Sequence, residues 1–158
     1  VHAFDFFTDE QIRTATKNGK VLRPFRNAVG IVNLDRPTAP KTEIVTASVN
    51  DDTAYGRPVV SPDGAQILVT VGSWRDAALG PNALITMPTR AKGGAAGAAL
   101  KQGEIYEPSW SPDGTKIVYV RREGGRRGIY VMDSGGSGET AITGDKGDFA
   151  QPLFSPQK

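Results

Sequence analysis

Short apolar segments alternate with glycine- and proline-rich breaks along most of the chain. Ala65–Thr70 and Thr115–Val120 are rich in β-formers and partly alternate between apolar and polar residues. A later segment, Gly128–Asp133, has the same character. Runs of this size that are bounded by turn residues predict strands rather than helices. The pattern therefore predicts an all-β fold built from hairpins.

One eight-residue motif recurs. Arg57–Gly64 reads Arg-Pro-Val-Val-Ser-Pro-Asp-Gly, Glu107–Gly114 reads Glu-Pro-Ser-Trp-Ser-Pro-Asp-Gly, and a third copy begins at Gln151–Pro156. The motif serines at 61, 111 and 155 are spaced by 50 and then 44 residues. Pro presets φ, Asp bonds back to the local backbone and Gly takes a positive φ, so Ser-Pro-Asp-Gly is a tight turn. Each full motif therefore predicts a strand, a turn and a second strand.

Two further strands follow this hairpin. In the last unit they are Gly128–Asp133 and Glu139–Thr143, and the start of the chain repeats the order at Gly30–Asp35 and Glu43–Thr46. The middle unit has a weaker third strand at Ala83–Met87. Four strands in about 45 residues are typical of a propeller blade.

The fourth strand of the middle unit is the weakest of the predicted strands. It falls in Lys92–Leu100, which is poor in β-formers, so we expect a short or frayed edge. The chain then holds the last two strands of one unit, two complete units and the first strand of another. The third motif also lacks the Asp-Gly pair.

The Ser-Pro-Asp-Gly hairpin followed by Ile129–Asp133 closely resembles the repeat of TolB-like, WD40-like β-propellers. The resemblance covers about residues 30–156, and Pro108–Thr143 is the strongest copy. It implies that residues 27–158 form an incomplete β-propeller of four-stranded antiparallel blades: a half blade, two full blades and the start of another. Closed propellers usually have about four to eight blades, so these blades would not close a ring alone.

Similar propellers lie in the bacterial periplasm and contact lipoproteins or envelope complexes. The resemblance thus implies a non-catalytic protein-binding module of the cell envelope. Open blade edges invite association, so we expect cover from a longer polypeptide, a second copy or other protein subunits. One alternative is an accessory structural subunit of a larger, membrane-associated complex. Another is the gating domain of a prolyl-oligopeptidase-type peptidase, which a G-x-S-x-G elbow downstream of Lys158 would establish.

The first 26 residues do not follow the repeat, and we assign residues 1–26 to an N-terminal arm. Thr8–Gln11 reads as a capping box, which predicts a short helix over about residues 9–17. Three phenylalanines either cover the side of the first blade or anchor the chain on a neighbouring protein. These candidate partner contacts are Phe4, Phe6 and Phe7.

Two loops carry the other candidate contacts. Four closely spaced arginines lie between the second and third strands of the last unit. They either form a solvent-exposed loop, as charge runs usually do, or place their guanidinium groups on one loop that binds an acidic partner. They are Arg121, Arg122, Arg126 and Arg127. In the middle unit the insertion at 72–81 holds Trp74 and Arg75, which either form an interface pair or pack under the loop.

Composition argues against most catalytic functions. The 158 residues include no cysteine and one histidine, His2, so thiol chemistry is excluded and a Ser-His-Asp triad or multi-histidine zinc site lacks its residues. Gly136–Ala141 matches G-x-G-x-x-A, but a strand and turn follow instead of the helix that a dinucleotide site needs. We therefore predict no enzyme activity and no cofactor.

Charge and hydropathy argue against nucleic acid and a membrane span as binding partners. A net charge of +2 does not demand nucleic acid, and no apolar run approaches the roughly 20 residues that span a bilayer. We predict protein partners, without a direct membrane span, although the chain could sit beside a membrane complex. Because the chain begins with Val1, we expect that an upstream segment was removed or is missing, and a cleaved export signal is one explanation.

Overall fold

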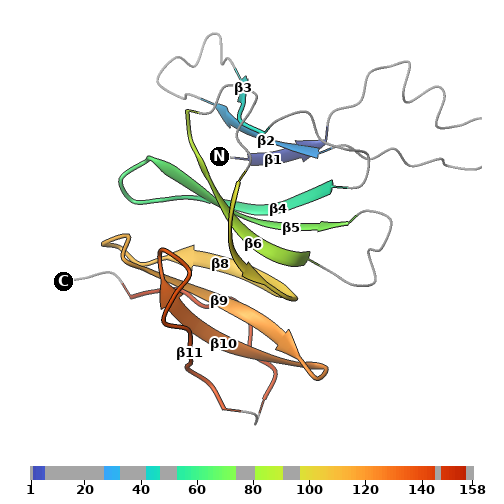
Figure 1. Cartoon of the computed structure of the whole chain (residues 1–158), viewed down its shortest axis with the longest axis vertical. Coiled ribbons are helices and arrows are strands. Elements are labelled where there is room, and N and C mark those ends of the chain that lie inside the picture. The colour runs from blue at the N-terminus through green and yellow to red at the C-terminus, as the bar shows by residue number, and fades with distance from the viewer. Residues whose placement is uncertain are drawn as a thin grey trace, which may run out of the picture.

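The computed structural model describes residues 2–5, 27–32, 42–46, 53–73, 81–90, 97–144 and 147–155. Strands and turns account for the regular structure in these ranges, and none of them contains a helix. Three antiparallel sheets stack on one another in chain order (Figure 1). The predicted all-β class is confirmed.

We name the sheets by their place in the chain, and each keeps its strands in chain order. The N-terminal sheet contains β1 (His2–Asp5), β2 (Asn27–Val32) and β3 (Thr42–Ile44). The central sheet contains β4 (Thr53–Val60), β5 (Gln66–Ser73), β6 (Pro81–Pro88) and β7 (Ala98–Gln102). The C-terminal sheet contains β8 (Ile105–Trp110), β9 (Lys116–Glu123), β10 (Arg126–Asp133) and β11 (Thr140–Ala141).

The two complete repeat units each form a four-stranded antiparallel sheet, as the motif spacing predicted. The fourth strands differ from the prediction. In the central sheet β7 begins at Ala98, inside the predicted segment, and has 5 residues. In the C-terminal sheet β11 has only 2 residues. The fourth strand is therefore shorter in the C-terminal sheet, although the sequence signal is weaker for the central sheet. β7 is longer because it pairs with β6 and because Leu100 packs on the core.

The start of the chain does not stand apart from the sheets. His2–Asp5 pairs with β2, so Phe4 lies opposite Ala28 and the first residues of the predicted arm belong to the N-terminal sheet. The helix predicted over residues 9–17 lies outside the described residues. β2 begins at Asn27, three residues before the predicted Gly30.

Hydrogen bonds from backbone amides to threonine hydroxyls show which residues of β2 and β10 are equivalent. The Val29 amide donates to Thr46 Oγ1 at 3.2 Å, and the Ile129 amide donates to Thr143 Oγ1 at 2.8 Å. Val29 therefore takes the place of Ile129, whereas the sequence pattern had matched Ile31 to it. Similar Gly-Ile pairs suggested the wrong register, and the cross-strand partners decide it.

The core lies between the sheets, and the central sheet is buried on both faces. Because side chains alternate along a strand, Leu68 faces the C-terminal sheet while Ile67 and Val69 face the N-terminal sheet. One cluster consists of Leu68, Leu84, Ile105, Ile117, Tyr119 and Met132. The other consists of Val29, Val45, Ile67, Val69 and Met87.

All three motif copies share one unusual backbone position. The residue before the motif proline has a positive φ in each copy: 50° at Arg57, 52° at Glu107 and 52° at Gln151. In the first two copies it lies at a register shift in the pairing of the first and second strands. The third copy has the same φ, but residues 151–155 form no strand. The predicted first strand of a further unit is therefore unpaired within the part of the chain that the structure describes.

Candidate functional site

The four arginines of the predicted contact loop lie on strands rather than on a loop. β9 and β10 are joined by Gly124 and Gly125, whose φ values of 57° and 84° suit glycine. The register pairs Arg127 with Arg122 and Gly128 with Arg121. We call residues 121–127 the arginine hairpin.

The arginine hairpin divides its cations between two faces. Paired residues share a face, and neighbours along a strand point to opposite faces. Arg121 and Arg126 thus lie on the face toward the central sheet, and Arg122 and Arg127 lie on the other. The expectation that all four guanidinium groups gather on one loop is wrong, because the strands continue through the arginine pairs.

Arg121 is the least available of the four. Its guanidinium donates to Glu139 at 3.0 Å and to Glu123 at 3.1 Å, and it lies 5.6 Å from the centre of the Tyr130 ring. Its side chain is 25% exposed. Arg121 therefore holds the C-terminal sheet together internally and presents little surface to a partner.

Glu139 is the centre of that network. Its carboxylate accepts from the Tyr119 hydroxyl at 2.7 Å, from Arg121, and from Lys101 on β7 of the central sheet. Burial opposes ionisation of Glu139, but these hydrogen bonds outweigh it and place the pKa of the carboxyl below its ordinary value. Burial, and then the bond to Glu139, raises the pKa of Tyr119. The network joins two sheets through one charged group.

The outer face of the arginine hairpin is more accessible. Arg122 and Arg127 are both exposed. Arg122 reaches Glu104 at 3.5 Å, and Arg127 lies 5.2 Å from the centre of the Tyr106 ring. Exposed pairs of this kind are weak, typically below about 1 kcal/mol, so a partner can replace them.

Arg126 lies beside a hollow of about 220 Å³ on the opposite face. Arg126 itself is exposed. Glu123, Tyr130 and Thr143 contribute to the lining of the hollow. The hollow gives this end of the C-terminal sheet a concave surface next to the Arg126 guanidinium.

The side chains of the remaining predicted contacts lie outside the part of the chain that the structure describes. Phe4 lies in β1, but its side chain is outside the described part of the structure. Phe6, Phe7, Trp74 and Arg75 lie outside the described residues. Their role as partner contacts stays a prediction.

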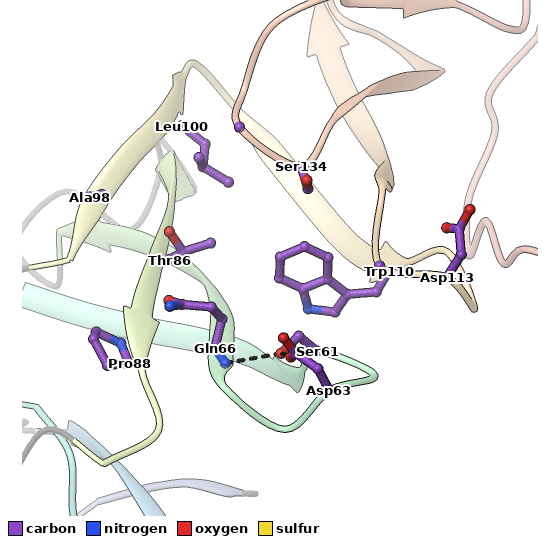
Figure 2. A pocket seen from close by; sticks show the side chains of 12 residues that line it. Ser61, Asp63, Gln66, Thr86, Pro88, Ala98, Leu100, Trp110, Asp113 and Ser134 are labelled. Carbon is purple, nitrogen blue, oxygen red and sulfur yellow. Dashed lines mark hydrogen bonds between the residues drawn. The ribbon is translucent and has the colours of Figure 1, made fainter.

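The structure adds a cleft that the sequence analysis missed. It lies between the central and C-terminal sheets, has a volume of about 730 Å³, and we call it the intersheet cleft (Figure 2). Its lining residues include Ser61, Asp63, Gln66, Thr86, Trp110 and Asp113. The only sequence signal for it was a tryptophan inside the second motif copy, where the first copy has Val60.

Both Ser-Pro-Asp-Gly turns lie at this cleft, and they have the same geometry. Ser61 Oγ donates to Asp63 Oδ1 at 2.5 Å, and Ser111 Oγ donates to Asp113 Oδ1 at 2.5 Å. The amide two residues after each aspartate donates to the same oxygen at 3.0 Å. Both turn glycines have a φ of 72°.

These hydrogen bonds keep the turn aspartates charged. The bond from Ser61, followed by the one from the Ala65 amide, lowers the pKa of Asp63. The bond from Ser111 and those from Thr115 lower the pKa of Asp113 to about 2. Both carboxylates are therefore ionised at neutral pH.

Two close approaches bound the intersheet cleft. A Cβ at Gly114 would lie 3.6 Å from Pro62 Cδ, in ordinary van der Waals contact, so the two turns lie next to each other. A Cβ at Gly136, where φ is 89°, would lie 2.8 Å from the Leu100 carbonyl oxygen. Gly136 therefore permits the loop after β10 to rest directly on the backbone of β7.

The described residues hold neither a cluster of three or more potential metal ligands nor a helix that could cross a membrane. The G-x-G-x-x-A match at 136–141 leads into the two-residue strand β11 and not into a helix. The prediction that a strand follows this match instead of a helix is confirmed.

The two complete repeat units share one turn motif and the same four-stranded antiparallel sheet. No family model matches the chain. The chain is 31% identical over 100 residues to the Tol-Pal system protein TolB of Xanthomonas oryzae pv. oryzae (strain PXO99A), which covers 63% of this chain and 21% of that protein. It is 44% identical over 52 residues to the TolB of Francisella tularensis subsp. mediasiatica (strain FSC147), covering 33% of this chain and 12% of that protein.

A solved structure of a TolB candidate from Agrobacterium tumefaciens has the same fold, with a TM-score of 0.53 and 21% identity. The match covers 78% of this chain and 42% of that one. The chain is similar in sequence to TolB proteins and similar in fold to a TolB-like structure, as the motif indicated. It spans about a fifth of the length of the Xanthomonas relative.

Proposed function

We propose that the chain is a non-catalytic protein–protein interaction module that works in the periplasm, as part of the bacterial cell envelope. The observation that carries the proposal is the 31% identity over 100 residues to a Tol-Pal system protein. Because the chain spans only 21% of that relative, it would provide one part of a larger binding surface.

In this proposal the three sheets are consecutive blades of one propeller. Residues 27–158 supply a half blade, two full blades and the start of another, and the arm at 1–26 adds β1 to the half blade. Other protein subunits or a second copy close the ring. One apolar side chain just after β11, Ile142 (60% exposed), is of the kind that such a cover would bury.

The exposed arginines supply the contact for an acidic partner. Arg126 and Arg127 are adjacent and lie on opposite faces of the hairpin, so a partner that clasps the hairpin end would meet both. Arginine suits this role because its planar guanidinium binds carboxylates with two parallel hydrogen bonds. Trp74, Arg75 and the three N-terminal phenylalanines remain predicted contacts on other parts of the surface.

Charge reversal of the hairpin tests the proposal. The full chain is exported to the periplasm of a bacterium that has a Tol-Pal system, cross-linked in the cells and compared with Arg126→Glu/Arg127→Glu. We expect discrete protein adducts for the parent chain and a loss of about tenfold for the double variant, since like charges repel a complementary surface.

Arg90→Glu is the matched control, because Arg90 is exposed just beyond β6 in the central sheet. Its adducts should equal those of the parent chain. No adducts above a non-exported control would refute the binding function. Adducts that survive the double reversal would keep the function and remove the arginine hairpin from the contact.

An accessory structural subunit of a larger complex is the second candidate, and the exposure of Leu153 favours it. Leu153→Asp should then abolish the assembly, while the arginine reversal leaves it intact. The opposite pattern would favour the interaction module.

A further inference from the structure

The intersheet cleft has the dimensions of a ligand site. Its volume of about 730 Å³ falls within the range of roughly 300–1,000 Å³ that is usual for such sites. Both sheets line it, so it exists only because the C-terminal sheet packs on the central sheet. It adjoins the start of β9 and is distinct from the arginine hairpin at the end of that strand.

The cleft is acidic in a chain whose net charge is +2. Among its described lining residues are two aspartates, Asp63 and Asp113, and no lysine or arginine. The hydrogen bonds that hold the two turns use only the Oδ1 atom of each aspartate. Both aspartates are exposed, and the second carboxylate oxygen of each takes no part in these turn bonds.

The indole ring of Trp110 lines the same cleft, and Figure 2 shows the Asp113 carboxylate turned away from it. Trp110 Nε1 donates to the Val59 carbonyl oxygen at 3.2 Å, which fixes the ring against β4. Figure 2 shows the ring among the lining side chains, with Gln66 and Thr86 on one side of it. The side chains of Gln66 and Thr86 make no hydrogen bond to another described residue, so both can bind a guest.

We propose that the intersheet cleft binds an arginine side chain of a peptide segment in a partner protein. A guanidinium over the indole face gains cation–π attraction, and its fork of N–H donors matches a carboxylate such as that of Asp63. The aliphatic stem of the arginine fits the apolar part of the lining, which Pro88 and Leu100 provide. A lysine lacks the planar fork, and a neutral or acidic peptide lacks the charge that the cleft complements.

A titration of the full chain tests the site directly. The probe is the blocked tripeptide acetyl-Leu-Arg-Leu-amide, and the readout is the NMR signal of the Trp110 indole N–H. We expect a saturable shift with an affinity on the order of millimolar, as suits one stacked and ion-paired side chain. The same peptide with citrulline in place of arginine keeps the shape without the charge and should bind at least about tenfold more weakly.

Variants of the turns locate the binding. Asp63→Asn/Asp113→Asn keeps an acceptor oxygen for each turn but removes both charges, and should weaken the arginine probe by about fivefold to twentyfold. Asp133→Asn is the matched control, because Asp133 is a surface aspartate paired with Lys116 and is not among the described lining residues. Its affinity should equal that of the parent chain.

Equal binding of the arginine and citrulline peptides would overturn the proposal, and so would an unchanged affinity in the double variant. Absence of any shift would also overturn it. Added salt gives a second measurement that does not depend on a variant, since affinity should fall as ions screen the carboxylates. The outcome is independent of the proposed function, because the probe does not touch the arginine hairpin.

Discussion

The Ser-Pro-Asp-Gly turn before β9 and the arginine hairpin after it lie at opposite ends of one strand, and they are held in different ways. At the turn, Asp113 bonds only to Ser111 and Thr115, its neighbours in the chain. At the hairpin, Arg121 bonds to Glu139, which is 18 residues away. The first end is built from local contacts and the second from distant ones.

This difference explains why one end repeats and the other does not. The turn of the central sheet repeats the bonds from the serine hydroxyl and from the amide two residues after the aspartate, at the same distances. The C-terminal turn adds one bond from the Thr115 hydroxyl, which Ala65 lacks. The hairpin has no such copy, because the corresponding connection in the central sheet runs from Ser73 to Pro81. A hydrogen bond between sequence neighbours recurs wherever the motif recurs. A contact between two sheets does not recur with the motif.

The largest expected effect comes from the strand that joins the two ends. Ile117 on β9 is fully buried in the cluster between the sheets. Ile117→Ala should lower the free energy of unfolding by about 2–5 kcal/mol, because it leaves a cavity. Urea unfolding of the full chain measures the loss. Ile142→Ala, at a side chain that is 60% exposed, should change stability by less than about 0.5 kcal/mol, and equal losses would mean that the sheets do not share this core.

The distant contacts at the hairpin end should show an intermediate effect. Glu139→Gln removes the charge that holds Lys101, Tyr119 and Arg121, and should cost about 1–3 kcal/mol of unfolding free energy. Glu104→Gln is a control on the same sheet, with a 37% exposed side chain bonded to Arg122 at 3.5 Å, and should cost less than about 1 kcal/mol. If both variants behaved alike, the link between the sheets would be no stronger than a surface pair.

The smallest effect is the pH response of the turn. The pKa of Asp113 is lowered from 3.8 to about 2, so this carboxyl contributes stability that is present above pH 3.8 and is lost as pH falls through its folded pKa. Thermal unfolding of Asp113→Asn should therefore depend less on pH than that of the parent chain between pH 3.8 and about 2.

Asp63→Asn should also reduce the pH dependence of thermal unfolding at acidic pH, because the pKa of Asp63 is lowered in the folded chain as well. Arg90→Ala, at an exposed residue beyond β6, should leave the acid profile unchanged. An acid profile that neither aspartate variant alters would show that the turns do not hold their carboxylates in the charged form.

Much of the fold could be predicted from the sequence. The motif copies at 57–64 and 107–114 identified both hairpins, and the segment at 128–133 placed β10 within two residues. The register of β2 could not be read in this way, because the neighbouring valines and isoleucines fit the core equally well by composition. The bond from the Val45 amide to the Val29 carbonyl and the bond from the Val29 amide to the Thr46 hydroxyl selected one register.

Less of the candidate site was predictable. The four arginines were identified by their spacing, but their division between two faces depends on β9 and β10 extending through them. The intersheet cleft escaped the sequence analysis because its lining comes from strands and turns of two sheets, which only packing brings together.

The sequence by itself determined the turns, since their hydrogen bonds join residues at most five positions apart and need no other part of the molecule. Only the tertiary structure decided which arginines face inward, where Glu139 joins the sheets, and that Trp110 and two carboxylates share one cleft. Those features depend on how the C-terminal sheet packs on the central sheet, because burial and charge act through space and not along the chain.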